Sequence, residues 1–252
     1  MSRHLRTVAY TAYLSVALVV MGIACMPVML FGRSLTRKTV QAWSRLALFG
    51  LKTIGGISYK IEGLENLPTG GALIASNHQS MWETIALYAL APKPAMIFKK
   101  ELLRIPIYGW YAIRAGNICV DRKGGAKALR AMAREARERA EAGEQIIIFP
   151  EGTRTKPGID AEYKPGIALL YKELEIECLP VALNTGTCWP AKGIIRYPGT
   201  MVVEFLPRIQ PGLSRKAFMK TLHDRIETRS LALAEDAGVN VSTTESAEAA
   251  NA

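Results

Sequence analysis

The amino-acid sequence predicts an α/β fold: a single domain with a largely parallel central sheet flanked by helices, preceded by an N-terminal membrane-binding helical segment. Short β-rich runs alternate with helical stretches from Ile57 onward, which is the pattern of an α/β domain. The run at 145–149 is almost continuously apolar, as is typical of strands covered on both faces. Before Ile57, residues 8–31 contain no charge and are long enough to cross a bilayer as a transmembrane helix.

Residues 1–55 are therefore expected to anchor the chain to a membrane. Basic residues flank the charge-free stretch on both sides, so the positive-inside rule assigns no orientation. Pro27 can break the stretch into a helical hairpin that returns to the same side. A cleaved signal peptide is the alternative. Residues 40–52 mix Trp43 and Phe49 with Arg45 and Lys52, which suits a helix in the membrane interface or a core helix.

Residues 56–234 are expected to form the α/β domain, and 235–252 a disordered tail, because the tail is rich in Ala, Ser, Thr and Glu. The expected strands are 58–63, 71–76, 95–100, 117–122, 145–150, 178–183 and 200–206. The expected helices are 81–91, 101–112, 124–142, 165–175 and 214–233. In the third of these helices, apolar residues recur at helical spacing opposite an Arg/Glu face.

The chain is strongly basic, which limits the kinds of partner it can have. Its 32 basic and 22 acidic residues give a net charge of +10, which suggests a negatively charged partner such as nucleic acid, an anionic membrane or a phosphorylated substrate. No basic stretch interleaved with aromatic residues supports nucleic-acid binding. The four cysteines form no C-x-x-C motif and the three histidines lie far apart, so neither a disulfide framework nor a metal site is expected.

The stretch ASNHQSMWET at 75–84 places His78 five residues before Glu83. Residues five apart point away from each other on a helix, but the two side chains can meet if His78 lies in a loop and the helix begins near Ser80. The residues from Ser80 to Glu83 also form a capping box. On that interpretation His78 is an ordinary loop residue, and the stretch alone does not decide between the two.

A second polar stretch, FPEGTR at 149–154, follows an apolar strand. Ligands of open α/β sheets usually bind at the carboxyl ends of strands. Glu151, Gly152, Thr153 and Arg154 offer an anion-binding fork and hydroxyl-binding groups in one loop. A solvated turn with a surface arginine is the alternative.

Together these stretches resemble the glycerolipid acyltransferases, of the bacterial 1-acyl-glycerol-3-phosphate acyltransferase type. N-H-x-S followed by a carboxylate, and FPEGTR about 70 residues later, are similar to two motifs of that family. Two further blocks are similar in the right order: 99–110, closing in Val120-Asp121-Arg122, and 179–184. The resemblance covers about residues 60–210. Where the family usually has aspartate, this chain has Glu83.

The resemblance implies direct transfer of a fatty acyl group from acyl-carrier protein or coenzyme A thioester to the sn-2 hydroxyl of lysophosphatidic acid, giving phosphatidic acid for phospholipid biosynthesis. His78 would be the general base and Glu83 would orient it; neither metal nor cofactor is implied. The residues implied for substrate binding are Lys99, Arg122 and Arg154 at the phosphate and Glu151, Gly152 and Thr153 in the loop beside it, with Glu151 and Gly152 shaping the glycerol end of the pocket.

The same resemblance implies an enzyme on the inner (cytoplasmic) membrane with its catalytic domain facing the cytoplasm, where the thioester donors are. Two other functions stay open at this point. One is acylation of another lyso-lipid, such as a lyso-ornithine lipid or a lysophospholipid. The other is a non-catalytic membrane protein that binds lipid.

Overall fold

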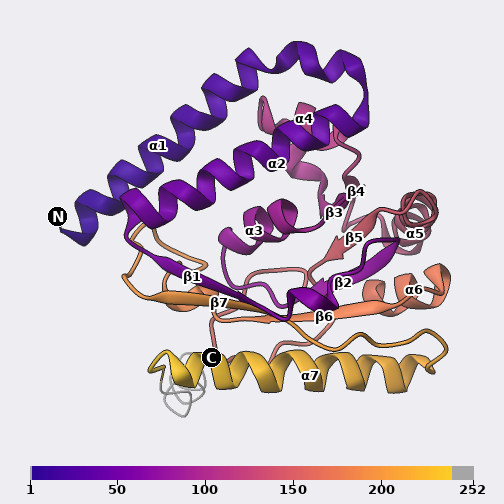
Figure 1. Cartoon of the computed structure of the whole chain (residues 1–252). Helices are drawn as coiled ribbons and strands as arrows, with labels where there is room; N and C mark the ends of the chain where they lie inside the picture. Colours follow the sequence, from indigo (N-terminus) through magenta and orange to yellow (C-terminus); the bar gives the residue numbers. More distant parts are fainter. Residues whose placement is uncertain (1, 240–252) are drawn as a thin grey trace.

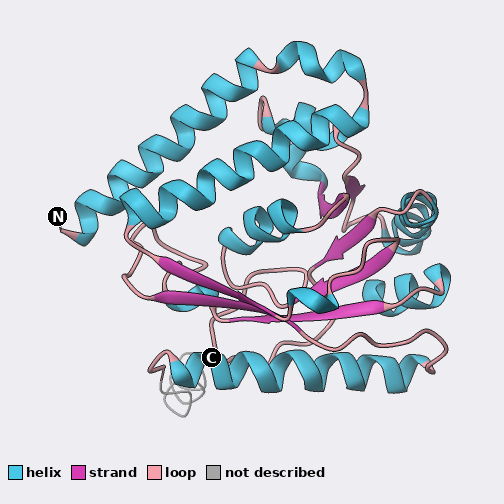
Figure 2. Ribbon diagram, in the orientation of Figure 1, coloured by secondary structure: helices cyan, strands magenta, loops and turns pink. Residues whose placement is uncertain are grey.

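A seven-stranded sheet forms the centre of the computed structural model, which describes residues 2–239 (Figures 1 and 2). The strand order is β1-β7-β6-β2-β5-β3-β4. The strands are β1 (Ser58–Glu62), β2 (Ala72–Ser76), β3 (Pro94–Lys99), β4 (Ile118–Val120), β5 (Gln145–Ile148), β6 (Cys178–Leu183) and β7 (Thr200–Phe205). All seven begin within two residues of the positions expected from the sequence.

Neighbouring strands pair in parallel except for β6 and β7, which are antiparallel. Strands β2 to β6 therefore run in one direction, and their carboxyl ends meet at one edge of the sheet. Strand β2 lies between β5 and β6 and is buried along its whole length. This position places the residue that follows Ser76 between two other strand ends. The predicted fold class is confirmed.

Helices cover both faces of the sheet. On one face lie α1 (Arg3–Ala24), α2 (Arg33–Gly50) and α3 (Trp82–Leu90), which share a hydrophobic core with the sheet. On the other lie α5 (Gly125–Glu141), α6 (Pro165–Leu174) and α7 (Arg215–Asp236). The apolar stripe expected on the helix at 124–142 faces this second core, where Met132, Ala133, Ala136 and Ala140 are buried.

The N-terminal segment is a helical hairpin. Helix α1 ends at Ala24, a 3-10 helix spans Met26–Phe31 with Pro27 in its first turn, and α2 returns from Arg33. Gly32, at φ 95°, makes the turn into α2, a backbone conformation that side chains disfavour. Helix α1 is long and apolar enough to cross a membrane, with a mean hydropathy of 1.8.

The hairpin also packs on the α/β domain. Tyr10 of α1 is fully buried, and its ring meets that of Trp189 edge-on with centroids 5.8 Å apart. The buried Arg37 of α2 pairs with the buried Glu144 before β5, at 2.5 Å. Residues 1–55 are thus joined to the domain by a core and by a buried ion pair.

Two expected helices differ in the structure. The stretch expected as one helix at 101–112 is a 3-10 helix, Lys100–Arg104, followed by α4 (Tyr108–Arg114). Pro106 explains the break, since it has no backbone N–H and favours an extended residue before it; Ile105 is extended. Helix α7 continues to Asp236, past the expected end at 233. The expected tail otherwise lies mostly outside the described residues.

Candidate active site

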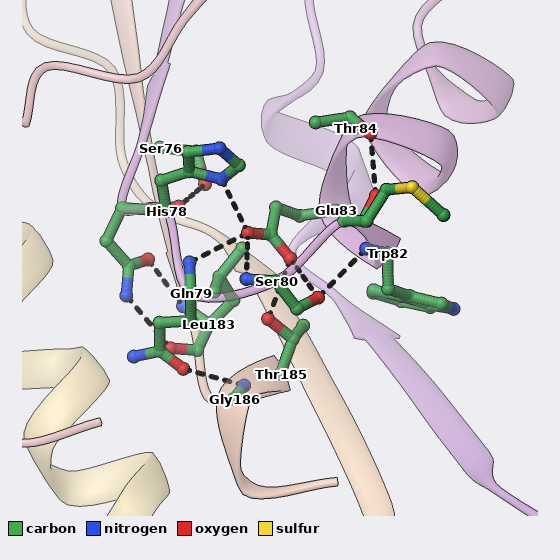
Figure 3. Close-up of polar contacts among 12 residues, drawn as sticks. Ser76, His78, Gln79, Ser80, Trp82, Glu83, Thr84, Leu183, Thr185 and Gly186 are labelled. Carbon is green, nitrogen blue, oxygen red and sulfur yellow. Dashed lines mark hydrogen bonds and ion pairs between the residues drawn. The ribbon is translucent and has the colours of Figure 1, made fainter. Parts of the chain in front are cut away.

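The carboxyl ends of three adjacent strands build the candidate site. His78 follows β2, Glu151 follows β5 and Thr185 follows β6. Helix α3 begins immediately after the His78 loop and directs Glu83, in its first turn, back toward that loop (Figure 3). The edge is the one at which open α/β sheets bind ligands.

His78 and Glu83 are in direct contact, with 2.7 Å between Nδ1 of the imidazole and Oε1 of the carboxylate. The helix begins at Trp82, so His78 is in the loop, as this contact requires. The capping interpretation is realised as well: Ser80 Oγ accepts from the Trp82 N–H at 2.9 Å, and Glu83 Oε1 accepts from the Ser80 N–H at 2.6 Å. One carboxylate therefore caps the helix and holds the imidazole.

Glu83 is fully buried and accepts hydrogen bonds from five donors. Oε1 accepts from His78 Nδ1 and from the backbone N–H groups of Gln79 (2.7 Å) and Ser80, while Oε2 accepts from the hydroxyls of Ser80 (2.7 Å) and Thr185 (2.8 Å). Burial raises the pKa of this carboxyl, but the bonds from His78 and Ser80 outweigh burial and the net shift is downward. Glu83 is therefore a carboxylate at neutral pH.

The imidazole of His78 is held by an aromatic ring against its face and by a carboxylate at one of its nitrogens. Its ring stacks on Phe149, with centroids 4.2 Å apart, and Nδ1 is engaged by Glu83. A carboxylate at Nδ1 favours the tautomer in which Nδ1 carries the proton and Nε2 has a free lone pair. The side chain is 14% exposed. A ligand can therefore reach the imidazole from solvent, while most of the ring is shielded from water.

The loop around His78 is fixed by residues on either side of it. Asn77 donates from Nδ2 to the Leu183 carbonyl at 3.0 Å and accepts from the Leu183 N–H at 3.0 Å, which bridges the ends of β2 and β6. The amides of Asn77 and Gln79 also donate to Ser230 Oγ on α7. Gln79 Oε1 accepts from the Gly186 N–H. The loop is therefore tied to both neighbouring elements through satisfied buried polar groups.

Glu151 supports the same loop from the strand β5 side. Its Oε1 accepts from the His78 backbone N–H at 2.9 Å, and its Oε2 lies 2.9 Å from Thr155 Oγ1. The Thr155 N–H donates to the His78 carbonyl at 2.8 Å. Glu151 is only 3% exposed, and burial raises its pKa to about 8. Its place at the glycerol end of the pocket stays a prediction; its contacts are with the His78 loop.

The residues expected at the phosphate lie along the same edge and are exposed. Lys99 ends β3, and its Nζ lies 3.7 Å from Glu101. Arg122 follows β4, and Arg154 lies in the loop after β5 beside the exposed Thr153. Within residues 2–239, the guanidinium groups of Arg122 and Arg154 make neither a hydrogen bond nor an ion pair. Gly152 has φ 71°, so the turn that presents Arg154 favours glycine.

Two contributors to the site were missed by sequence reasoning. Thr185 lies 102 residues after Glu83, directly after the 179–184 block, and only strand order brings it to the carboxylate. Phe149 belongs to the FPEGTR stretch, but nothing in that stretch indicated an aromatic ring against the imidazole. Within residues 2–239, no cluster of three or more potential ligands could hold a metal ion.

Comparisons with known proteins identify the family. The acyltransferase family model matches residues 58–184. The chain is 35% identical over 206 residues to the 1-acyl-sn-glycerol-3-phosphate acyltransferase of Pseudomonas aeruginosa, covering 81% of this chain and 80% of the relative. It is 29% identical over 174 residues to the Helicobacter pylori protein of the same name, covering 68% and 73%.

The fold is also that of a solved member. The crystal structure of the 1-acyl-sn-glycerophosphate (LPA) acyltransferase from Thermotoga maritima matches with a TM-score of 0.76 and 21% identity, covering 92% of this chain and 97% of that one. The family match spans β1 to the end of β6 and includes the His78–Glu83 pair and the FPEGTR loop. The chain therefore belongs to the acyltransferase family.

Proposed function

We propose that this chain is a 1-acyl-sn-glycerol-3-phosphate acyltransferase that makes phosphatidic acid on a membrane. The contact between His78 and Glu83 at the carboxyl edge of the sheet carries the proposal, because it joins an oriented base to the place where such sheets bind ligands. The names of the related proteins supply the acceptor. The donor would be an acyl thioester of acyl-carrier protein or coenzyme A.

The reaction needs a base at the acceptor hydroxyl, because a neutral hydroxyl attacks a thioester poorly. His78 Nε2 takes the hydroxyl proton as the acceptor oxygen forms a bond to the thioester carbonyl carbon. Glu83 holds the Nδ1 proton and stabilises the imidazolium that results. Its hydrogen bonds with His78 and Ser80 keep the carboxylate charged, and the bonds from Gln79 and Thr185 help to hold it in place.

Collapse of the tetrahedral intermediate then breaks the carbon–sulfur bond. The departing thiolate takes the proton from the imidazolium, so the products are an ester and a free thiol, and His78 is neutral again. The acyl group passes directly from sulfur to oxygen, and His78 needs only to carry one proton across the site.

The exposed cations at the edge give the acceptor phosphate its binding site in this proposal. Arg154 presents a guanidinium without a competing carboxylate among the described residues, and such a group binds phosphate oxygens in pairs. Lys99 and Arg122 extend the positive edge along β3 and β4. The net charge of +10 favours approach to an anionic lipid surface.

The N-terminal hairpin would hold the enzyme at that surface. Helix α1 has the length and apolarity of a membrane span, and only 17% of its most apolar 18-residue stretch is buried in the protein. The thioester donors are cytosolic, so the catalytic domain belongs on the cytoplasmic side of the inner membrane. A membrane-held enzyme reduces the distance that a lipid acceptor must rise out of the bilayer.

Labelled acyl transfer tests the proposal. Wild type, His78→Ala and His223→Ala are assayed in matched membranes with acyl-carrier-protein and coenzyme A donors. The acceptors are lysophosphatidic acid, lysophosphatidylcholine and a lyso-ornithine lipid. His223 is the control because it lies on α7 and pairs with Asp160, away from the His78 loop. Transfer to lysophosphatidic acid should be lost in His78→Ala and kept in His223→Ala.

Other outcomes separate the alternatives. Transfer only to another lyso-lipid would retain the base and replace the acceptor. No transfer by folded wild type to any acceptor would reject the enzyme and favour lipid binding alone. Equal activity in the His78→Ala variant and wild type would reject the base.

A further inference from the structure

The exposed large apolar side chains are concentrated in one part of the molecule. Of the 21 that are exposed among residues 2–239, twelve belong to the N-terminal hairpin, four to residues 105–113 and two to the loop at 194–197. The loop contacts α1, since Arg196 bonds to Thr7. In the described part of the chain, the other three are Leu64, Leu213 and Leu231. Scattered apolar residues need no explanation, but a concentration of exposed apolar side chains on neighbouring elements marks an interaction surface.

Helix α4 is held against the turn of the hairpin (Figure 1). The Tyr111 hydroxyl donates to the Gly22 carbonyl of α1 at 3.1 Å, and Arg114 Nε donates to the Met29 carbonyl at 2.6 Å. Ile107 packs so closely on Gly22 that a Cβ there would lie 2.3 Å from Ile107 Cγ2. Helix α4 is therefore a direct neighbour of the hairpin, and both carry exposed apolar side chains.

The outward side of α4 is apolar. Gly109, Tyr111 and Ala112 face the protein and are buried, whereas Ile105, Trp110 and Ile113 are 45%, 52% and 52% exposed. Arg104 and Arg114, both exposed, flank this group. Tryptophan beside arginine at the border of an apolar surface is the composition that favours a membrane–water interface.

The chain path gives this surface a place near the site. The 3-10 helix and α4 connect β3 to β4, and the connection leaves from Lys99 at the carboxyl edge of the sheet. That edge also carries His78 and Arg154. A lipid contact at Ile105 and Trp110 thus lies on the segment that begins at the expected phosphate site.

We propose that Ile105 and helix α4 form a second membrane contact, separate in sequence from the N-terminal hairpin, which inserts Trp110 and Ile113 into an anionic phospholipid bilayer. The inference rests on the proposed membrane association of this enzyme. The occupant is a bilayer because α4 packs against the hairpin that contains a span-length apolar helix, and because arginines border its exposed apolar side chains. With two contacts, the sheet edge is held at one orientation to the headgroups.

Fluorescence quenching tests the contact directly. The full chain is reconstituted in vesicles of phosphatidylcholine and phosphatidylglycerol, with or without brominated acyl chains. Of the four tryptophans, Trp82 and Trp189 are buried, Trp43 is partly buried and Trp110 is exposed. Bromolipid should quench wild type, and most of the quenching should be absent in Trp110→Phe, which keeps an apolar ring. Equal fractional quenching of the two proteins would overturn the proposal.

A partition measurement supplies the second readout. Trp110→Ser/Ile113→Ser should reduce vesicle affinity by roughly tenfold, whereas Leu64→Ser/Leu213→Ser, at exposed apolar residues elsewhere, should leave it unchanged. Equal affinities of the two double variants would contradict the contact. So would wild type that does not bind vesicles, or a dimer in detergent that Trp110→Ser/Ile113→Ser converts to a monomer, since a second copy would then cover α4.

Acyl transfer in detergent micelles keeps the two proposals distinguishable. Transfer by Trp110→Ser/Ile113→Ser should equal that of wild type there, because no bilayer has to be reached. Loss of wild-type transfer in micelles would reject the proposed reaction without affecting the quenching result.

Discussion

Glutamate at position 83 is accommodated by the residues around it. The longer side chain reaches back across the first turn of α3, so that one oxygen meets His78 and the other meets the hydroxyls of Ser80 and Thr185. The stretch alone left the contact of His78 with Glu83 open, and the family resemblance implied it, because both residues lie within one loop and one helical turn. Thr185 could not be predicted, because its position depends on β6 lying beside β2.

Replacing the charge at Glu83 should separate its two functions. Glu83→Gln keeps the shape of the side chain but removes the charge that stabilises an imidazolium, so kcat should fall by roughly 10²- to 10⁴-fold with little change in KM. Steady-state kinetics measures both constants, and circular dichroism checks that the helix is retained. A Glu83→Gln enzyme with wild-type kcat would show that the carboxylate only caps α3.

Thr185 should act as a positioning residue for Glu83. Thr185→Val removes one donor to the charged form, so the pKa of Glu83 should rise from its lowered position. A lowered carboxyl pKa stabilises the fold above the ordinary pKa of glutamate, and this stabilisation is lost as the pH falls through the folded value. Thr185→Val should therefore cost about 1–3 kcal/mol at neutral pH, and less in acid.

The control for that variant is Thr185→Ser, which keeps the hydroxyl. The acid limb of the pH–rate profile should move to higher pH in Thr185→Val and return toward wild type in Thr185→Ser. Identical profiles for the two variants would show that the hydroxyl of Thr185 does not influence Glu83 and that the residue only packs.

Glu151 should make stability depend on pH in the opposite sense. Its pKa is raised to about 8 by burial, so between the ordinary value and 8 the folded chain holds a proton that the unfolded chain releases. The free energy of unfolding should therefore fall as the pH rises through that range and level off above it. Thermal unfolding from acid to alkaline pH should show this slope in wild type and a flatter one in Glu151→Gln. A parallel slope in the variant would assign the pH dependence to other groups.

Most helix and strand positions could be predicted because their hydrophobic patterns are local. The stripe of α5 and the apolar runs of β2 and β5 are examples. The stretch at 101–112 shows where pattern alone fails, since its apolar residues fit one helix but Pro106 divides it. The exposed side of α4 was not predicted either, because periodicity indicates an apolar side without telling whether protein or lipid covers it.

The pair between Arg37 and Glu144 should hold the hairpin to the catalytic domain. Both side chains are buried, and Arg33 and Arg139 lie within 4.0 Å of the same carboxylate. Glu144→Ala leaves Arg37 buried without its partner and should lower the free energy of unfolding by roughly 3–5 kcal/mol. Urea denaturation measures this.

Two variants control that measurement. Glu138→Ala, at an exposed glutamate of α5, should change stability by less than about 0.5 kcal/mol. Arg37→Met/Glu144→Leu should recover most of the loss, because it removes both charges. A small effect of Glu144→Ala would mean that water reaches the pair and that the hairpin is held by its apolar contacts alone.

At the scale of the whole molecule, charge and apolar surface should act together. The net charge of +10 should make binding to vesicles tighter when phosphatidylglycerol is added, and salt should weaken that gain because exposed charges are screened. Sedimentation with neutral and anionic vesicles at low and high salt measures both effects. Salt-independent binding to anionic vesicles would leave only the apolar hairpin and α4 as the source of affinity.

Ser230, which secures the His78 loop, is synthesised late because it lies near the end of the chain. The His78 loop is tied to α7 through Asn77 and Ser230, which are 153 residues apart, and to β6 through Leu183. Because a chain emerges from the ribosome N-terminus first, the loop is synthesised long before the helix that secures it. The oriented base is therefore complete only after α7 has been released and has docked, so a nascent chain that already holds the hairpin and the His78 loop still lacks a finished active site.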